Sequence, residues 1–166
     1  MKKTLLIVSL VMIMTLGTMW ASDVSFEKGQ KFVTGQIGLN SYAIPFGAGY
    51  SMAITDNIEV GATVMLQMWS DFGFSFTVIT PSADVYYHFT SLDLPVDLFA
   101  GASLGYSIFT SDTGYKGLFA SSLYLSPMLG VRYFFSEKLA VSLKLFFSVM
   151  GEYGGVGSLL GVTLIL

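Results

Sequence analysis

The 166-residue sequence predicts an all-β protein, an eight-stranded antiparallel up-and-down transmembrane β-barrel preceded by a cleaved signal peptide. Three observations predict this class. Hydrophobic residues make up 53% of the chain and charged residues 11%, which is less than half of the usual share of about 25%. The first residues follow the pattern of an export signal. After them, apolar positions alternate with small or polar positions, and this is the period of β-strands.

The composition excludes several classes of protein. Disorder requires low hydrophobicity and a high net charge, and the surface of an ordinary soluble domain needs more charge than this chain carries. The absence of cysteine excludes disulfides, thiolate metal sites and a catalytic cysteine. With 8 Lys and Arg against 11 Asp and Glu, the sequence offers no basic footprint for nucleic acid. We therefore expect a membrane protein that is surrounded by lipid.

The N-terminus predicts the domain organisation: residues 1–21 are a signal peptide and residues 22–166 form a single outer-membrane β-barrel domain. Lys2 and Lys3 precede the apolar run Leu5–Leu16, and small residues follow it. The run is well short of the roughly 20 residues that a membrane-spanning helix needs. Retention of this segment as an uncleaved anchor is the alternative.

Strict alternation predicts the strands. In Leu139–Met150 the odd positions are all apolar, and the even positions include Ser142 and Lys144. In Ile58–Trp69 the even positions are apolar, and the odd positions include Glu59. Turn-forming residues divide the chain into eight segments of this kind. The predicted strands are 31–41, 46–55, 58–69, 75–89, 96–108, 118–135, 138–150 and 156–166.

Five charged residues lie well within the predicted strands, and all five fall on the face opposite the apolar residues. A soluble lipocalin-like barrel would show the inverse pattern, with apolar side chains inside. Because the apolar face is too wide and too aromatic for water, we expect it to face lipid and the polar face to line a lumen. The sheet must close, since an open edge in hydrocarbon leaves backbone groups unpaired. The predicted lumen residues are Glu59, Asp84, His88, Asp97, Arg132 and Lys144.

Outward aromatic residues gather toward the two ends of the predicted strands. Aromatic rings prefer the membrane interface, where the apolar body faces the lipid tails and the polar edge faces the headgroups. The alternative is that aromatic residues are present only because they favour strands. The predicted aromatic girdle residues are Tyr50, Tyr87, Phe89, Tyr106, Phe119, Tyr133, Phe135 and Phe147.

The segments Tyr50–Gly61 and Gly130–Leu139 each contain a strand, a tight acidic turn and a returning strand. In this they resemble the periplasmic hairpins of the small eight-stranded outer-membrane β-barrel proteins of Gram-negative-type bacteria. The resemblance implies a monomer in the cell outer membrane, in contact with outer-membrane lipids and lipopolysaccharide. It also implies assembly by the barrel-assembly machinery and periplasmic chaperones. Leu164 and Leu166 stand at the C-terminal assembly signal, where members of the family typically end in an aromatic residue.

The lumen residues suggest a plug. An eight-stranded barrel has an interior just wide enough for side chains to fill, and buried charges must be paired. Simple hairpin registers place His88 opposite Asp97, and Lys144 opposite Gly130. Arg132 is expected to be the main cation, chiefly for Asp97 on the neighbouring strand, with Glu59 and Asp84 within reach across the barrel. A narrow channel for ions or small apolar molecules is the alternative to a closed lumen.

The sequence predicts no enzyme, no metal site and no cofactor. His88, the single histidine, lies one residue from a periplasmic turn, whereas related enzymatic barrels place catalytic groups toward the outer leaflet. A lone histidine beside an aspartate is more often a structural pair than a base. An adhesin works through long loops, and the loops predicted here have about five to nine residues. We therefore predict a non-enzymatic, structural or surface-exposed barrel.

Overall fold

A computed structural model describes residues 26–40, 43–71, 74–89, 96–111, 121–150 and 155–166. The predicted signal peptide and Phe119 lie outside these ranges. Within them, no helix is long and apolar enough to cross a membrane.

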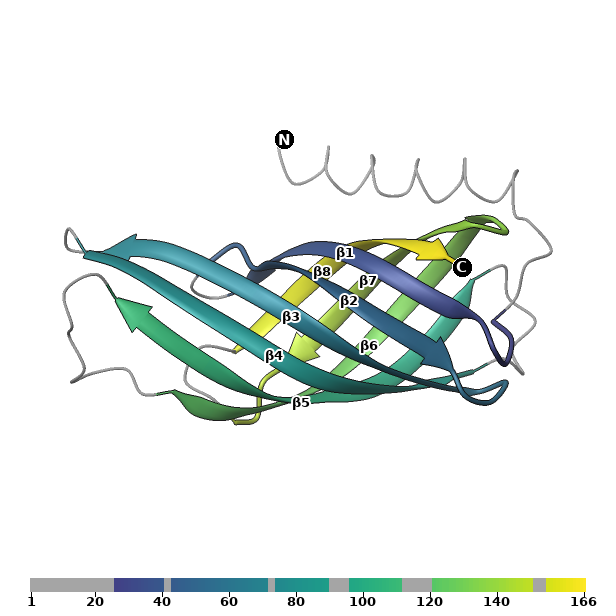
Figure 1. Cartoon of the computed structure of the whole chain (residues 1–166), viewed down its shortest axis with the longest axis horizontal. Helices are drawn as coiled ribbons and strands as arrows, with labels where there is room; N and C mark the ends of the chain where they lie inside the picture. The colour runs from purple at the N-terminus through teal and green to yellow at the C-terminus, as the bar shows by residue number, and fades with distance from the viewer. Residues whose placement is uncertain (1–25, 41–42, 72–73, 90–95, 112–120, 151–154) are drawn as a thin grey trace, which may run out of the picture.

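The described chain forms a closed barrel in which every strand pairs antiparallel with its neighbours in sequence, and β1 pairs with β8 (Figure 1). This confirms the predicted fold class. We call the end where β1 begins and β8 ends the terminal end, and the opposite end the loop end. The strands are β1 (Lys31–Asn40), β2 (Phe46–Ala53), β3 (Ile58–Asp71), β4 (Phe74–His88), β5 (Asp97–Ser111), β6 (Ser122–Ser136), β7 (Leu139–Phe147) and β8 (Val156–Ile165).

The strand boundaries differ from the predicted ones at the loop end. β7 ends at Phe147, before the predicted limit at residue 150. The ladder from β6 to β7 pairs Met128 with Phe146, and next pairs Leu125 with Met150 in an isolated bridge. Between these two pairs, the chain that continues from β7 has one residue more than β6. This extra residue forms a bulge. Pro127 lies opposite it, and proline has no N–H to donate to a regular ladder.

Alternation continues along each strand, and it sorts the side chains by environment. In β7 the odd positions are exposed or half-buried and the even positions are buried. The large exposed hydrophobic side chains lie on the outside, and two buried clusters lie in the lumen. The lumen face includes the small residues Gly101 and Gly105, where an added Cβ would approach the neighbouring backbone closer than 2.5 Å. Small residues here let the narrow barrel close around its larger side chains.

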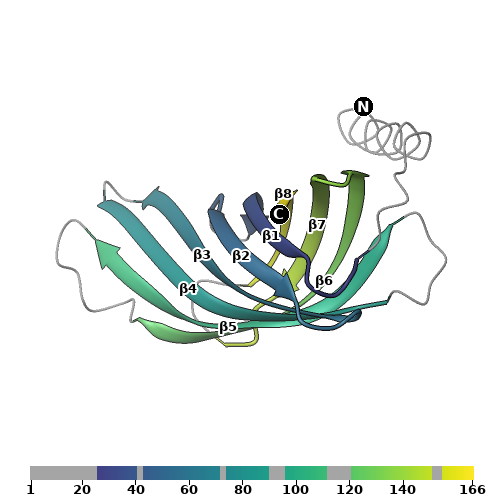
Figure 2. The same cartoon turned by 45° about the vertical axis from the view of Figure 1, so that its right-hand side comes forward.

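The strands β3, β4 and β5 extend beyond the rest of the sheet at the loop end (Figure 1 and Figure 2). Pairing of β2 with β3 stops at Leu66, whereas β3 continues to Asp71. The outward positions in this extension become polar. They change from Met68 to Ser70 on β3, and from Ile108 to Thr110 on β5. The apolar outer surface therefore ends near this level, and the extension lies beyond the apolar belt.

Candidate functional site

All six predicted lumen residues point into the barrel. Their side chains are at least nine-tenths buried, although every one of them is ionisable. They come from five successive strands, because each occupies an inward position of its own strand. Glu59 is on β3, Asp84 and His88 on β4, Asp97 on β5, Arg132 on β6 and Lys144 on β7.

A continuous chain of charged contacts crosses the lumen near the terminal end. His88 Nδ1 lies 2.8 Å from Asp97 Oδ2, and His88 Nε2 lies 3.2 Å from Glu59 Oε2. Arg132 Nη1 lies 2.9 Å from the same Glu59 oxygen, and Arg132 Nη2 donates a hydrogen bond to Glu59 Oε1 at 3.3 Å. Ser51 donates a further hydrogen bond to Glu59 at 2.6 Å. We call Asp97, His88, Glu59 and Arg132 the charged chain.

Two predicted pairings need correction. His88 stands opposite Phe99, and its contact with Asp97 is a diagonal one, which is within reach across an antiparallel pair. Arg132 does stand opposite Asp97 in the ladder, but its ion pair is with Glu59, which the sequence placed within reach as a secondary partner. The histidine ring is bound to the Asp97 carboxylate, and the longer arginine side chain reaches across the lumen instead.

Aromatic rings enclose the charged chain. The Arg132 guanidinium lies 4.5 Å from the centre of the Phe32 ring and 5.6 Å from that of Phe99. The Phe26 ring stacks on His88 with centroids 3.7 Å apart. Such rings exclude water and contribute cation–π attraction. Parity alone places Phe32 and Phe99 on the lumen face, whereas Phe26 precedes the first strand, where the period-two pattern makes no prediction.

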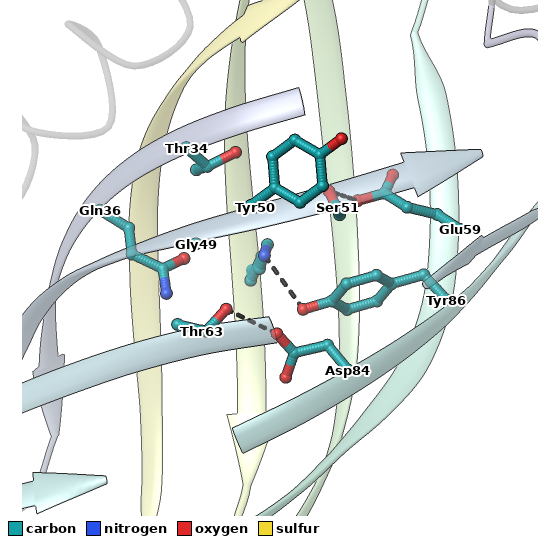
Figure 3. Close-up of a pocket in the computed structure, with 10 residues that line it drawn as sticks. Thr34, Gln36, Gly49, Tyr50, Ser51, Glu59, Thr63, Asp84 and Tyr86 are labelled. Carbon is teal, nitrogen blue, oxygen red and sulfur yellow. Dashed lines mark hydrogen bonds between the residues drawn. The ribbon is translucent and has the colours of Figure 1, made fainter. Parts of the chain in front are cut away.

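Asp84 (Figure 3) and Lys144 belong to a second polar group, and both line the same small cavity in the lumen. Asp84 accepts hydrogen bonds from three hydroxyls, those of Thr63 at 2.5 Å, Ser82 at 3.2 Å and Ser103. Lys144 stands opposite Gly130, as the hairpin register predicted. Its ammonium donates to the Tyr86 hydroxyl at 3.2 Å and lies 4.7 Å from the centre of that ring.

Small cavities separate these groups. One of about 30 Å³ is lined by residues that include Gln36, Asp84, Tyr86 and Lys144. Another of about 10 Å³ extends toward Glu59. Figure 3 shows Gln36, Thr63, Asp84 and Tyr86 converging on the smaller cavity. A water molecule needs roughly 10–15 Å³, so these spaces admit one or two waters and no larger solute.

The geometry around His88 is that of a structural pair. Both ring nitrogens face carboxylates, and two phenylalanine rings lie close to the imidazole: Phe26 stacks on it, and the tilted Phe99 ring has its centre 5.3 Å from that of the imidazole. A catalytic base needs one nitrogen directed at a nucleophile or a substrate proton. Within the described ranges, no group of three or more His, Cys, Asp and Glu is placed to hold a metal ion.

The described residues of the predicted aromatic girdle all occupy outward positions. Two pairs of these rings pack edge to face. The ring centroids of Tyr87 and Phe89 are 5.4 Å apart, and those of Tyr133 and Phe135 are 4.8 Å apart. Their role at the membrane interface stays a prediction. The outward residues among the eight are Tyr50, Tyr87, Phe89, Tyr106, Tyr133, Phe135 and Phe147.

The predicted assembly signal belongs to the strand that closes the barrel. Leu164 is exposed on β8, opposite Val33 on β1. The backbone N–H of Leu166 donates a hydrogen bond to the Lys31 carbonyl at 2.9 Å. Both leucine side chains face outward, and their recognition by the assembly machinery stays a prediction.

No protein-family model matches the chain, and no curated protein matches it. The N-terminal β-barrel domain of Pseudomonas aeruginosa OprF is similar in structure, with a TM-score of 0.65 and 16% identity, over 84% of this chain and 98% of that one. Neisserial surface protein A gives a TM-score of 0.57 and 16% identity, over 81% and 94% of the two chains.

A third similar structure is that of the Yersinia pestis outer membrane protein Ail in a phospholipid bilayer nanodisc. Its TM-score is 0.56 at 12% identity, over 84% of this chain and 100% of that one. The outer-membrane location that the sequence predicts agrees with these neighbours. At such identities the likeness is one of fold, and this chain has the fold of the small eight-stranded outer-membrane β-barrel proteins.

Proposed function

We propose that this protein is a non-enzymatic integral outer-membrane β-barrel, structural or surface-exposed, whose lumen is closed by its own side chains. The observation that carries the proposal is the charged chain, because it joins side chains from four successive strands, β3 to β6, across a narrow lumen. The side chains of Glu59, His88 and Arg132 are each no more than 2% exposed. Their mutual contacts replace the hydration that they would have in an open pore.

The outer surface of the barrel supports the proposal that the protein is embedded in a lipid bilayer. Exposed Leu, Ile, Val and aromatic side chains surround the barrel, and a soluble monomer rarely exposes so large an apolar surface. We infer that outer-membrane lipids and lipopolysaccharide cover it. Barrel-assembly machinery and periplasmic chaperones are the partners that export and insertion require. Since a closed barrel has no free edge for pairing with another chain, we propose a monomer.

The membrane assignment is tested by gel mobility. We expect a heat-modifiable band in the outer-membrane fraction, because a closed barrel satisfies its backbone hydrogen bonds internally and resists SDS until it is boiled. The measurement compares boiled and unboiled samples of the same fraction. Equal mobility in both, together with recovery in the soluble periplasm, would contradict the membrane assignment.

The closed lumen is tested by electrical recording. We expect purified wild-type protein in planar bilayers to carry little or no steady current, because the interior is filled with side chains. A large and stable conductance would contradict the closed lumen and would support the alternative, a narrow channel for ions or small apolar molecules. Heat-modifiable migration of the same preparation is the control for a folded barrel.

A further inference from the structure

The residues that precede β1 reverse direction and enter the barrel. Residues 26–30 form a turn in which the Gln30 N–H donates a hydrogen bond to the Glu27 carbonyl at 3.3 Å. Gly29 has a φ of +91°, a conformation that glycine adopts without strain and other residues adopt rarely. The turn therefore depends on glycine at this position.

Backbone contacts attach this turn to the rim of the barrel. The Gly29 N–H donates to the Ala53 carbonyl at 2.8 Å, and the Ala53 N–H donates to the Gln30 carbonyl at 2.9 Å. The Lys28 N–H donates to the Asp56 carboxylate at 3.1 Å. These bonds extend the ladder between β1 and β2 past its last paired residues. They hold the segment across the terminal end of the barrel.

Phe26 is the part of the segment that lies inside the mouth. It is 4% exposed, and it belongs to a buried cluster with Phe32, Ala53, Phe134 and Ala140. Its ring stacks on His88 at an interplanar angle of 9°. The ring therefore covers the charged chain on the side of the terminal end.

We propose that residues 26–30, which we call the stopper, close the mouth of the barrel at the terminal end. The side chain that fills the mouth is that of Phe26. The proposal rests on the closed lumen proposed above and adds a second closure at the terminal end. Removal of the segment from the mouth opens a path from that side to His88 and Asp97. The interior beyond Arg132 stays closed.

The absence of cysteine from the natural chain permits a direct test by thiol labelling. Ala140→Cys places one thiol in the cluster around Phe26, at a position that is 0% exposed. The probe is a small cationic methanethiosulfonate reagent, applied to the folded protein in lipid vesicles. We expect slow labelling in this background, and labelling faster by about tenfold or more when Phe26→Ala is added, because the covering ring is gone.

A second variant keeps Phe26 and alters the turn. A Cβ at Gly29 meets nothing within 4 Å, so Gly29→Ala acts through the backbone conformation alone. Strain at a positive φ is expected to raise the labelling rate at position 140 by about tenfold. The matched control is Gly35→Ala, which also meets nothing within 4 Å but needs no positive φ. This control should leave the rate unchanged.

A thiol elsewhere in the lumen locates the opening. Ser126→Cys lies on β6 at a position that is 0% exposed, and Arg132 lies between it and the mouth. Its labelling should stay slow in every variant. The stopper is refuted by fast labelling at position 140 with the natural N-terminal segment, by unchanged labelling in folded Phe26→Ala and Gly29→Ala, or by an equal rise at position 126. High conductance of the wild type would instead refute the closed lumen.

Discussion

Replacement of Arg132 by alanine is expected to lower the free energy of unfolding by about 3–5 kcal/mol, because it leaves the Glu59 carboxylate buried without its main cation. Glu59 is 2% exposed, and its remaining contacts are with His88 and Ser51. The measurement is equilibrium unfolding of the refolded barrel in lipid vesicles, followed by tryptophan fluorescence. Water that enters the vacated space would reduce the loss and raise the conductance.

Double-mutant cycles decide which carboxylate Arg132 stabilises. The cycle of Arg132→Met with Glu59→Gln should show a coupling of about 1–3 kcal/mol, since the two side chains are in contact. The cycle of Arg132→Met with Asp97→Asn should show much less, because Asp97 binds His88. A larger coupling with Asp97 than with Glu59 would contradict the pairing in the structure and would restore the one that the sequence suggested.

Replacement of Leu129 by arginine is expected to impair insertion and to lower the free energy of unfolding by about 2–4 kcal/mol if this position lies at mid-bilayer depth. Leu129 is 62% exposed at the middle of β6, opposite Ala100 and Leu145. The measurement is the folded fraction after addition to vesicles, read from the heat-modifiable band.

Ser75→Arg is the matched control for this charge. Ser75 is also exposed and outward on β4, but it lies in the extension of β3, β4 and β5 that continues past the apolar belt. We expect an effect near zero there, because an arginine outside the hydrocarbon keeps its hydration. If both variants insert like the wild type, the outer face does not lie against lipid.

The alternating pattern determined most of this fold before any tertiary contact was known. Period two assigns each side chain of a strand to one of two faces, so the inward position of Glu59 or Lys144 follows from neighbours a few residues away. The apolar outer face requires lipid, and lipid requires closure of the sheet. Closed topology thus followed from local spacing. The register that places Lys144 opposite Gly130 followed from a short turn.

Only the tertiary structure decided which ionisable side chains pair with one another inside the lumen. Arg132 and Glu59 are 73 residues apart, on strands that are not neighbours, and their ion pair depends on how far the side chains reach across the barrel. Ladder position favoured Asp97, whose carboxylate binds His88. Local spacing orders the faces of a strand, but it does not tell which of several inward groups meet.

The position of Phe26 is the clearest case of this limit. It lies outside the alternating segments, and its burial comes from a turn at Gly29 and from contacts with Ala53, His88 and Ala140 on three other strands. Each of these contacts exists only after the barrel has closed and formed a mouth. The sequence by itself therefore determined the barrel and its two faces. The tertiary structure decided which side chains close it, because closure brings together residues that no local period relates.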